Sequence, residues 1–206
     1  MGSGAEQAVK PFKLAALTPP AWVGMVEQDL TGLLSDHAHC ELKAASTAQA
    51  LLLKHRTNTP LVAELSAMAA EEMQHFQRAV ELLHARGGTL GPVETNEYAE
   101  RLLSESGSTR GDVLLDRLLI AGLIELRSLE RFHLLAEGLA DRELASLYRE
   151  LIPSESGHQA LFDRLARSFF DGELVARRQA ELLEIEGRVA REVSPGSRVH
   201  AGWSTL

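Results

Sequence analysis

Four long stretches of the chain repeat apolar residues at helical spacing, and this feature limits the fold more than any other. The first two stretches span residues 21–56 and 60–86, and the last two span residues 112–139 and 141–170. Apolar residues three and four positions apart form one face of an α-helix, which must be buried against other helices. The pattern therefore predicts four packed helices.

Residues that start or stop helices separate these stretches. Thr59 is expected to cap the second helix, with Pro60 at its first position, and Gly87 is expected to end it. Asp112 and Asp141 are expected to cap the third and fourth helices, because an aspartate side chain accepts hydrogen bonds from the free N–H groups of a first turn.

The connection between the second and third helices, residues 88–111, is too long for a tight turn and should contain a short helix at 94–103. Two helical hairpins joined by one long crossover are typical of ferritin-like bundles. We therefore predict an all-α, ferritin-like four-helix bundle with one long crossover and an additional C-terminal helix. The predicted divisions are an N-terminal extension, a single ferritin-like domain and a C-terminal tail, at residues 1–20, 21–193 and 194–206.

Charge and cysteine content narrow the class of protein. The formal net charge is −8, which argues against a broad basic surface for nonspecific nucleic-acid binding. Cys40 is the single cysteine, so no intrachain disulfide can form and a cytoplasmic location is expected. No apolar run approaches the roughly 20 residues that cross a bilayer, so no membrane partner is expected.

Carboxylates and imidazoles interrupt the apolar stripes of all four helices. Such groups are costly on a buried face unless they are paired or bind metal. Di-iron bundles use one Glu from each of two helices and a Glu-x-x-His pair from each of the other two. The residues that fit this pattern are Glu41, Glu72, His75, Glu125, Glu155 and His158.

The Glu-x-x-His spacing alone is weak evidence, because two further pairs have it, Glu81/His84 and Glu130/His133. Helical direction separates them, since each residue turns the helix by about 100°. Glu81 points away from Glu72, and Glu130 points about 140° away from Glu125. We therefore expect these two pairs to be solvated or at the rim of the bundle.

The position of the six residues within the hairpins is stronger evidence. Residues on antiparallel helices lie at one level when they are equally far from the turn. The midpoint between Glu41 and Glu72 falls at residues 56–57, and the midpoint between Glu125 and Glu155 falls at Ala140. Both midpoints coincide with predicted turns, so the six side chains should meet at one level of the bundle.

Four carboxylates and two imidazoles form a mainly oxygen-ligand set, which suits iron or manganese better than a thiolate zinc site. Without metal, these groups should loosen the middle of the bundle. Glu71 is expected beside the site or on the surface. His37 either contacts Glu41 or is an ordinary packed or exposed histidine, and Cys40 is expected to be a small buried residue.

The chain also resembles a known family, the bacterial tRNA 2-methylthio-N6-isopentenyl-adenosine hydroxylases. The resemblance covers most of residues 18–170, and its motifs are more specific than the ligand pattern, which generic ferritin-like proteins share. The matching segments are TPPAWV (18–23), DHAHCELKAASTA (36–48), EEMQHF (71–76), LIELRSLERF (123–132) and SESGH (154–158).

The resemblance implies an oxygen-dependent hydroxylation of the isopentenyl side chain on a modified adenosine beside the tRNA anticodon. It implies two iron ions held by the six residues above, O2 as co-substrate, and a separate reductase that donates electrons. Pro153 departs from the family pattern and is expected to kink its helix just before Glu155. Some of six arginines are candidates for tRNA phosphate contacts, with ordinary surface ion pairs as the alternative: Arg127, Arg131, Arg164, Arg167, Arg177 and Arg178.

Three other functions fit the residues less well. A ferroxidase or iron-handling protein would use the same ligands, and a manganese catalase-type peroxide scavenger would use a similar set. A non-enzymatic helical adaptor would need six ligands to meet at one level by accident. The family motifs favour the hydroxylase.

Overall fold

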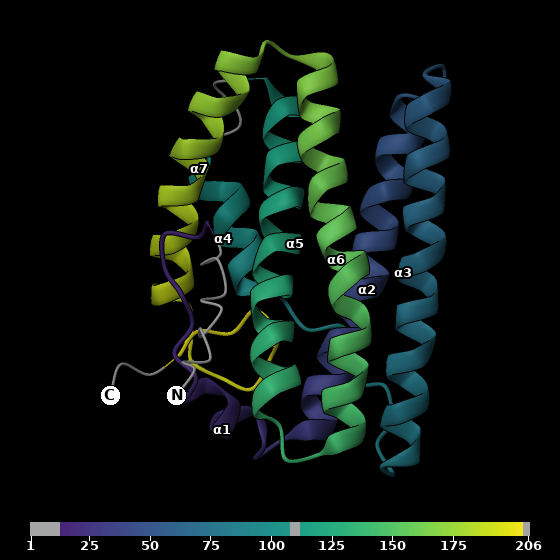
Figure 1. Cartoon of the computed structure of the whole chain (residues 1–206), viewed down its shortest axis with the longest axis vertical. Helices are drawn as coiled ribbons and strands as arrows, with labels where there is room; N and C mark the ends of the chain where they lie inside the picture. The colour runs from purple at the N-terminus through teal and green to yellow at the C-terminus, as the bar shows by residue number, and fades with distance from the viewer. Residues whose placement is uncertain (1–12, 108–111, 204–206) are drawn as a thin grey trace, which may run out of the picture.

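The computed structural model describes residues 13–107 and 112–203. Seven helices and no strand form within these ranges (Figure 1). In chain order they are α1 (Trp22–Val26), α2 (Leu30–Lys54), α3 (Thr59–Ala85), α4 (Glu97–Glu105), α5 (Val113–Gly138), α6 (Arg142–Phe169) and α7 (Gly172–Glu192).

The helices form two antiparallel hairpins. Helix α2 packs along α3, and α5 packs along α6. The crossover between the hairpins carries α4, and α7 returns along α5 on the side away from α3 (Figure 1). The predicted all-α bundle with one long crossover and an additional C-terminal helix is therefore confirmed.

Side-chain caps fix where the long helices begin. The Asp112 and Asp141 carboxylates accept hydrogen bonds from the first backbone N–H groups of α5 and α6, as predicted. The cap of α3 is Asn58, whose side chain accepts from Leu61 N at 3.2 Å, so the prediction of Thr59 was wrong by one residue. Gly87, with φ of +74°, ends α3, because glycine adopts this left-handed conformation without steric cost.

The first apolar stretch is not the single helix that we predicted. It divides into α1 and α2, because the Asp29 side chain accepts a hydrogen bond from Gly32 N at 2.9 Å and starts a new helix. Helix α1 lies at the base of the bundle, where Trp22 and Val26 are buried (Figure 1). Helix α6, unlike the first stretch, is not divided: it runs from Arg142 to Phe169 with Pro153 inside it.

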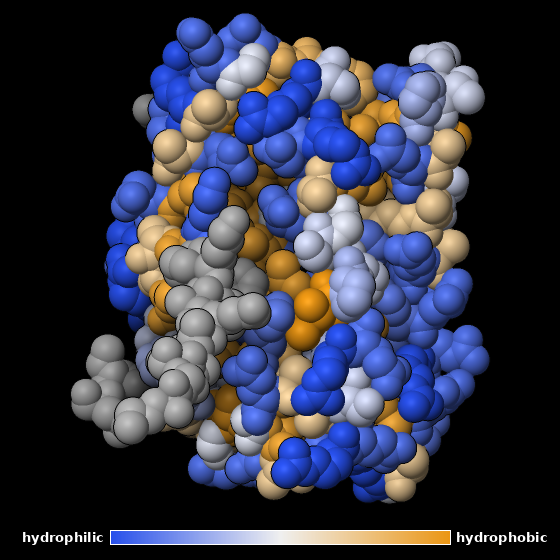
Figure 2. All heavy atoms as spheres, in the orientation of Figure 1, coloured by the Kyte–Doolittle hydropathy of each residue, from blue (hydrophilic) through white to orange (hydrophobic). Residues whose placement is uncertain are grey.

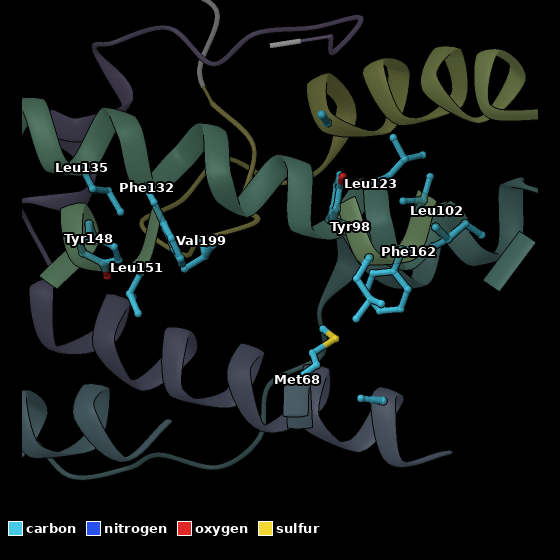
Figure 3. Close-up of a cluster of buried hydrophobic side chains, with 14 of the residues drawn as sticks. Met68, Tyr98, Leu102, Leu123, Phe132, Leu135, Tyr148, Leu151, Phe162 and Val199 are labelled. Atoms are coloured by element: carbon cyan, nitrogen blue, oxygen red, sulfur yellow. The ribbon is translucent and has the colours of Figure 1, made fainter. Parts of the chain in front are cut away.

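The core lies between the hairpins and extends under α4 and α7. Met68, Tyr98, Leu123 and Phe162 belong to one buried cluster (Figure 3). The two helices of the second hairpin approach closely at Gly122, where an added Cβ would lie 3.2 Å from the Cβ of Phe162. The glycine therefore lets α5 and α6 pack tightly one turn before Glu125.

Residues near both ends of the described chain pack on α5. The Arg131 guanidinium lies over the Trp22 ring, 4.0 Å from its centroid, and 5.3 Å from that of Trp203. Arg131 also donates a hydrogen bond to Ala201 O at 2.8 Å. The segment 194–203 thus adds buried side chains to the bundle. The domain boundaries given above remain a prediction.

The face over α5, α6 and α7 is mainly hydrophilic at its ends and shows apolar atoms at its middle (Figure 2). Leu118, Leu119 and Leu126 line a hollow on this face. Within the described ranges, every helix is too short or too polar to cross a membrane.

Candidate metal centre

All six predicted residues meet at one level of the bundle. Helix α2 supplies Glu41, α3 supplies Glu72 and His75, α5 supplies Glu125, and α6 supplies the remaining pair. They form two groups in which the potential ligand atoms lie within 4.8 Å of one another. One group is Glu41, Glu72, His75 and Glu155, and the other is Glu72, Glu125, Glu155 and His158.

Glu72 and Glu155 belong to both groups, so their carboxylates lie between two potential metal positions. His75 Nδ1 lies 3.6 Å from Glu72 Oε2 and 3.7 Å from carboxylate oxygens of both Glu41 and Glu155. On the other side, His158 Nδ1 lies 2.8 Å from Glu72 Oε1. Each imidazole therefore directs its Nδ1 towards the shared carboxylates.

The outward nitrogens of both histidines have their own partners. His158 Nε2 lies 2.9 Å from Glu71 Oε2, and His75 Nε2 lies 3.4 Å from Ser154 Oγ. The Ser154 hydroxyl donates to Leu151 O, so it can accept from the His75 Nε2–H. These contacts favour the tautomer with the proton on Nε2, which leaves the Nδ1 lone pair directed into the centre, as metal-binding histidines require.

Glu41 is held from behind by His37, whose Nε2 contacts Glu41 Oε1. The His37 ring is fully buried between Phe132 and Tyr148, with ring centroids 5.1 and 5.4 Å away. Of the two alternatives for His37, the structure shows the one in contact with Glu41. Glu71 likewise lies beside the centre, although its side chain is half exposed. Cys40 is free and half-buried.

The buried polar atoms at this centre fit a bound metal. Both Glu72 oxygens, one Glu155 oxygen and Nδ1 of His75 and His158 are buried without a hydrogen-bond partner. The 2.8 Å approach of His158 Nδ1 to Glu72 thus lacks hydrogen-bond geometry. Buried polar atoms without partners are costly, and cations shared between these converging lone pairs would satisfy them.

Burial and mutual repulsion change the proton affinities of these groups. Burial lowers the pKa of His75, but the facing carboxylates of Glu41 and Glu72 outweigh it and raise the pKa to about 10. The pKa of His158 rises in the same way to about 9. Burial, reinforced by the charge of Glu72, raises the pKa of Glu125 to about 8. At neutral pH the metal-free centre therefore holds several protons.

Metal loading at pH 7 is expected to release at least about two protons per chain, one from each histidine, because a coordinated Nδ1 cannot keep its proton. Since both pKa values are raised, metal affinity should fall as the pH falls. A pH indicator in weakly buffered solution measures the release. His158→Gln should release about one proton fewer, whereas exposed His84→Gln should behave as the wild type. Equal release from all three proteins would contradict coordination by His158.

Removing the carboxylate that supports His158 should weaken metal binding. Glu71→Ala is expected to reduce metal affinity about 10- to 100-fold, because such outer contacts orient a ligating imidazole and raise its basicity. Glu64→Ala, an exposed change on the same helix, should leave affinity within about twofold. Competition titration with a chelator measures both variants. Equal affinities would mean that Glu71 does not act through His158.

The two remaining Glu-x-x-His pairs behave differently from each other. Glu81 and His84 are exposed, as predicted. Glu130 is buried, so the prediction of a solvated or rim position was wrong for it. Its carboxylate accepts hydrogen bonds from Thr18 N at 2.6 Å and from Arg127 Nη1 at 3.1 Å. Neither pair is part of the metal centre.

Three of the six arginines that are candidates for tRNA contacts are instead engaged in contacts within the protein. Arg127 and Arg131 are each about 1% exposed, so they are not available to phosphates. Arg178 pairs with Asp116 at 2.7 Å and donates to Ser106 O at 2.6 Å. Arg164 pairs with Glu64, and Arg167 pairs with Asp163, as the alternative of ordinary surface ion pairs predicts. Arg177 is exposed.

Ser154 is a residue of this centre that the sequence did not reveal. It directly precedes Glu155, but a serine beside a ligand has no distinctive spacing, and only the fold shows its hydroxyl against His75. Tyr148 lies in the apolar stretch 141–170, and only the fold shows that its ring stacks on His37.

Comparison with known proteins places the chain among tRNA hydroxylases. The sequence model of the tRNA-(MS2IO6A)-hydroxylase family (MiaE) matches residues 7–201. The chain belongs to this family. A relative from Pseudomonas putida KT2440 is 34% identical over 92% of this chain and 92% of its own length, and is named tRNA 2-(methylsulfanyl)-N(6)-isopentenyladenosine(37) hydroxylase.

A second relative of the same name, from Salmonella typhimurium LT2, is 26% identical over 90% of this chain and 86% of its own length. Among solved structures, a Synechococcus protein described as having aldehyde deformylating oxygenase activity has a TM-score of 0.86. It is 34% identical, and the match covers 94% of this chain and 98% of that one. This likeness confirms the ferritin-like fold, and the family matches confirm the resemblance inferred from the sequence motifs.

Proposed function

We propose that this protein hydroxylates the isopentenyl side chain of 2-methylthio-N6-isopentenyladenosine in tRNA, next to the anticodon. The observation that carries the proposal is the pair of ligand groups sharing Glu72 and Glu155, in a chain of the tRNA hydroxylase family. A ferroxidase or a catalase-type scavenger could use such ligands, but the family match favours the hydroxylase.

The ligand set supports iron as the metal. Each potential position has carboxylate oxygens and one imidazole nitrogen, which suits iron and disfavours a thiolate zinc site. We propose that these six residues would hold the two ions, and that Glu72 and Glu155 would contribute to both positions because they belong to both groups. A di-iron centre, when bound, supplies the activation of O2 that hydroxylation of an unactivated C–H bond requires.

The protein's own residues position this chemistry and keep water from it. His37 fixes the Glu41 carboxylate, while Ser154 and Glu71 fix the two imidazoles. All four carboxylates are at least nine-tenths buried, so bulk water has little access to the centre. Hydroxylation consumes O2, two electrons and two protons, and it yields the alcohol and one water. We therefore propose a reductase partner as the electron source.

A single-turnover experiment tests the function. Reduced, iron-loaded protein is mixed with 18O2 and tRNA carrying the methylthio-isopentenyl adenosine, and the nucleosides are analysed by mass spectrometry. One 18O atom should appear on that nucleoside. Oxidised, retained iron without nucleoside product would instead support iron handling. An aldehyde offered in a parallel reaction tests the activity named for the Synechococcus protein.

A further inference from the structure

One cavity of the described structure includes a residue of the metal centre in its lining. It has a volume of about 170 Å3, lies between α2, α4, α5 and α6, and has Glu125 in its wall. Four other cavities in the described part of the chain contain none of the six candidate ligands in their linings. A ligand in this cavity would therefore approach the metal centre directly.

On three helices, a residue that lines this cavity lies about one turn from a candidate metal ligand. Ala121 lies one turn before Glu125 on α5. Ala44 lies three residues after Glu41 on α2, and Phe162 lies four residues after His158 on α6. Residues three or four positions apart share one face of a helix. The same helix faces therefore present the ligands at the centre and apolar side chains in the adjoining cavity.

The remaining walls come from α4 and the C-terminal segment. Leu103 of α4 is half exposed and marks the side open to solvent, where Lys43 and Thr47 also line the cavity. His200 closes another side, with its ring stacked on Tyr98 at 5.2 Å.

His200 adds no charge to the cavity. Its Nδ1 accepts from the Asn96 side-chain amide at 3.1 Å, so its proton lies on Nε2, which is 3.1 Å from Ser128 Oγ. Burial lowers the pKa of His200 to about 3, so the ring is neutral at physiological pH. The Asn96 carbonyl oxygen meanwhile caps α4 by accepting from Ala99 N at 3.0 Å. The wall is therefore fixed and uncharged.

The volume of the cavity limits the size of the group that it can hold. An apolar cavity of about 150 Å3 holds a six-carbon benzene ring. At about 170 Å3, this cavity can hold a five-carbon isopentenyl group but not an adenosine with its ribose. Small residues such as Ala44 and Ala121 keep the space open, because a larger side chain at either position would fill it.

From this arrangement, and resting on the proposed function, we infer that the cavity beside Glu125 binds the isopentenyl group of the modified adenosine. The base then stays at the mouth, near Lys43 and Thr47, while the side chain reaches the metal centre. Ala44, Ala121 and Phe162 are the residues that determine acceptance of the prenyl chain.

Two substitutions that fill the cavity from different helices test this inference, Ala121→Leu and Ala44→Leu. The matched control is Ala50→Leu, an equal change at an exposed position of α2. Iron-loaded protein is titrated anaerobically, so that no turnover occurs, with anticodon stem-loop RNAs that carry either isopentenyladenosine or plain adenosine. Fluorescence anisotropy measures both dissociation constants, and circular dichroism checks folding.

The wild type and Ala50→Leu should bind the prenylated RNA at least about tenfold more tightly than the plain RNA, because several carbons leave water. In each filled variant this ratio should fall to about one, with the affinity for plain RNA unchanged. Because the two variants alter different helices, either one that folds is sufficient for the test.

A ratio preserved in a folded Ala121→Leu or Ala44→Leu protein would overturn the inference, and so would a ratio near one in the wild type. The binding ratio is independent of catalysis. The wild type could show the tenfold preference and the filled variants could lose it, while the single-turnover experiment gives no oxygen transfer. That combination would overturn the hydroxylase function but would support the prenyl site.

Discussion

Replacing Glu72 with glutamine is expected to remove most of the bound metal and to lower hydroxylation at least about 10³-fold, because the metal provides several kcal/mol of catalysis. Glu72 is fully buried and belongs to both ligand groups, so the loss of its charge affects both metal positions. Glutamine keeps the size of the side chain, so the packing of α3 should survive.

Two matched variants make this prediction specific. Glu125→Gln changes a candidate ligand that belongs to one group only, so this variant should retain roughly one metal ion per chain. Glu81→Gln is an exposed change on the same helix as Glu72 and should keep wild-type metal content and activity. Metal is measured by elemental analysis and activity by single turnover. Two ions per chain in Glu72→Gln would contradict a contribution of Glu72 to both positions.

The meeting of the six residues could be predicted from the sequence because helical hairpins have simple geometry. Equal distances from a turn place residues of antiparallel helices at one level, and both hairpins satisfied this rule. The groups around the centre could not be predicted in the same way. The contact of Glu71 with His158 and that of Ser154 with His75 depend on how α3 and α6 pack against each other.

The wrong prediction for Glu130 and the candidacy of Arg127 as a phosphate contact share one physical cause. Both interpretations assume that α5 buries a single face, the one towards the candidate metal centre. Helix α5 is also covered on other sides, by α7 and by the segments around residues 16–18 and 194–203. A residue 140° away from Glu125 is therefore buried too, and polar residues there need partners.

Those partners form a buried ion network centred on Arg127. Its guanidinium contacts Glu186 Oε1 at 2.6 Å and Glu130 Oε2 at 3.1 Å, and it donates to Ala16 O at 2.9 Å. Tyr98 adds a hydrogen bond to the same Glu186 oxygen at 2.9 Å. The network thus joins α4, α5, α7 and the N-terminal segment.

Arg127→Met is therefore expected to destabilise the protein by about 3–5 kcal/mol, because it leaves buried carboxylates without their counter-charge. For a chain of this size the midpoint of thermal unfolding should fall by roughly 6–20 °C. Arg164→Met is the control, since its pair with Glu64 is exposed and contributes at most about 1 kcal/mol. Thermal unfolding monitored by circular dichroism measures both variants. If Arg127→Met instead left stability unchanged and weakened tRNA binding, Arg127 would be a phosphate contact, and its burial against Glu186 could not describe the protein in solution.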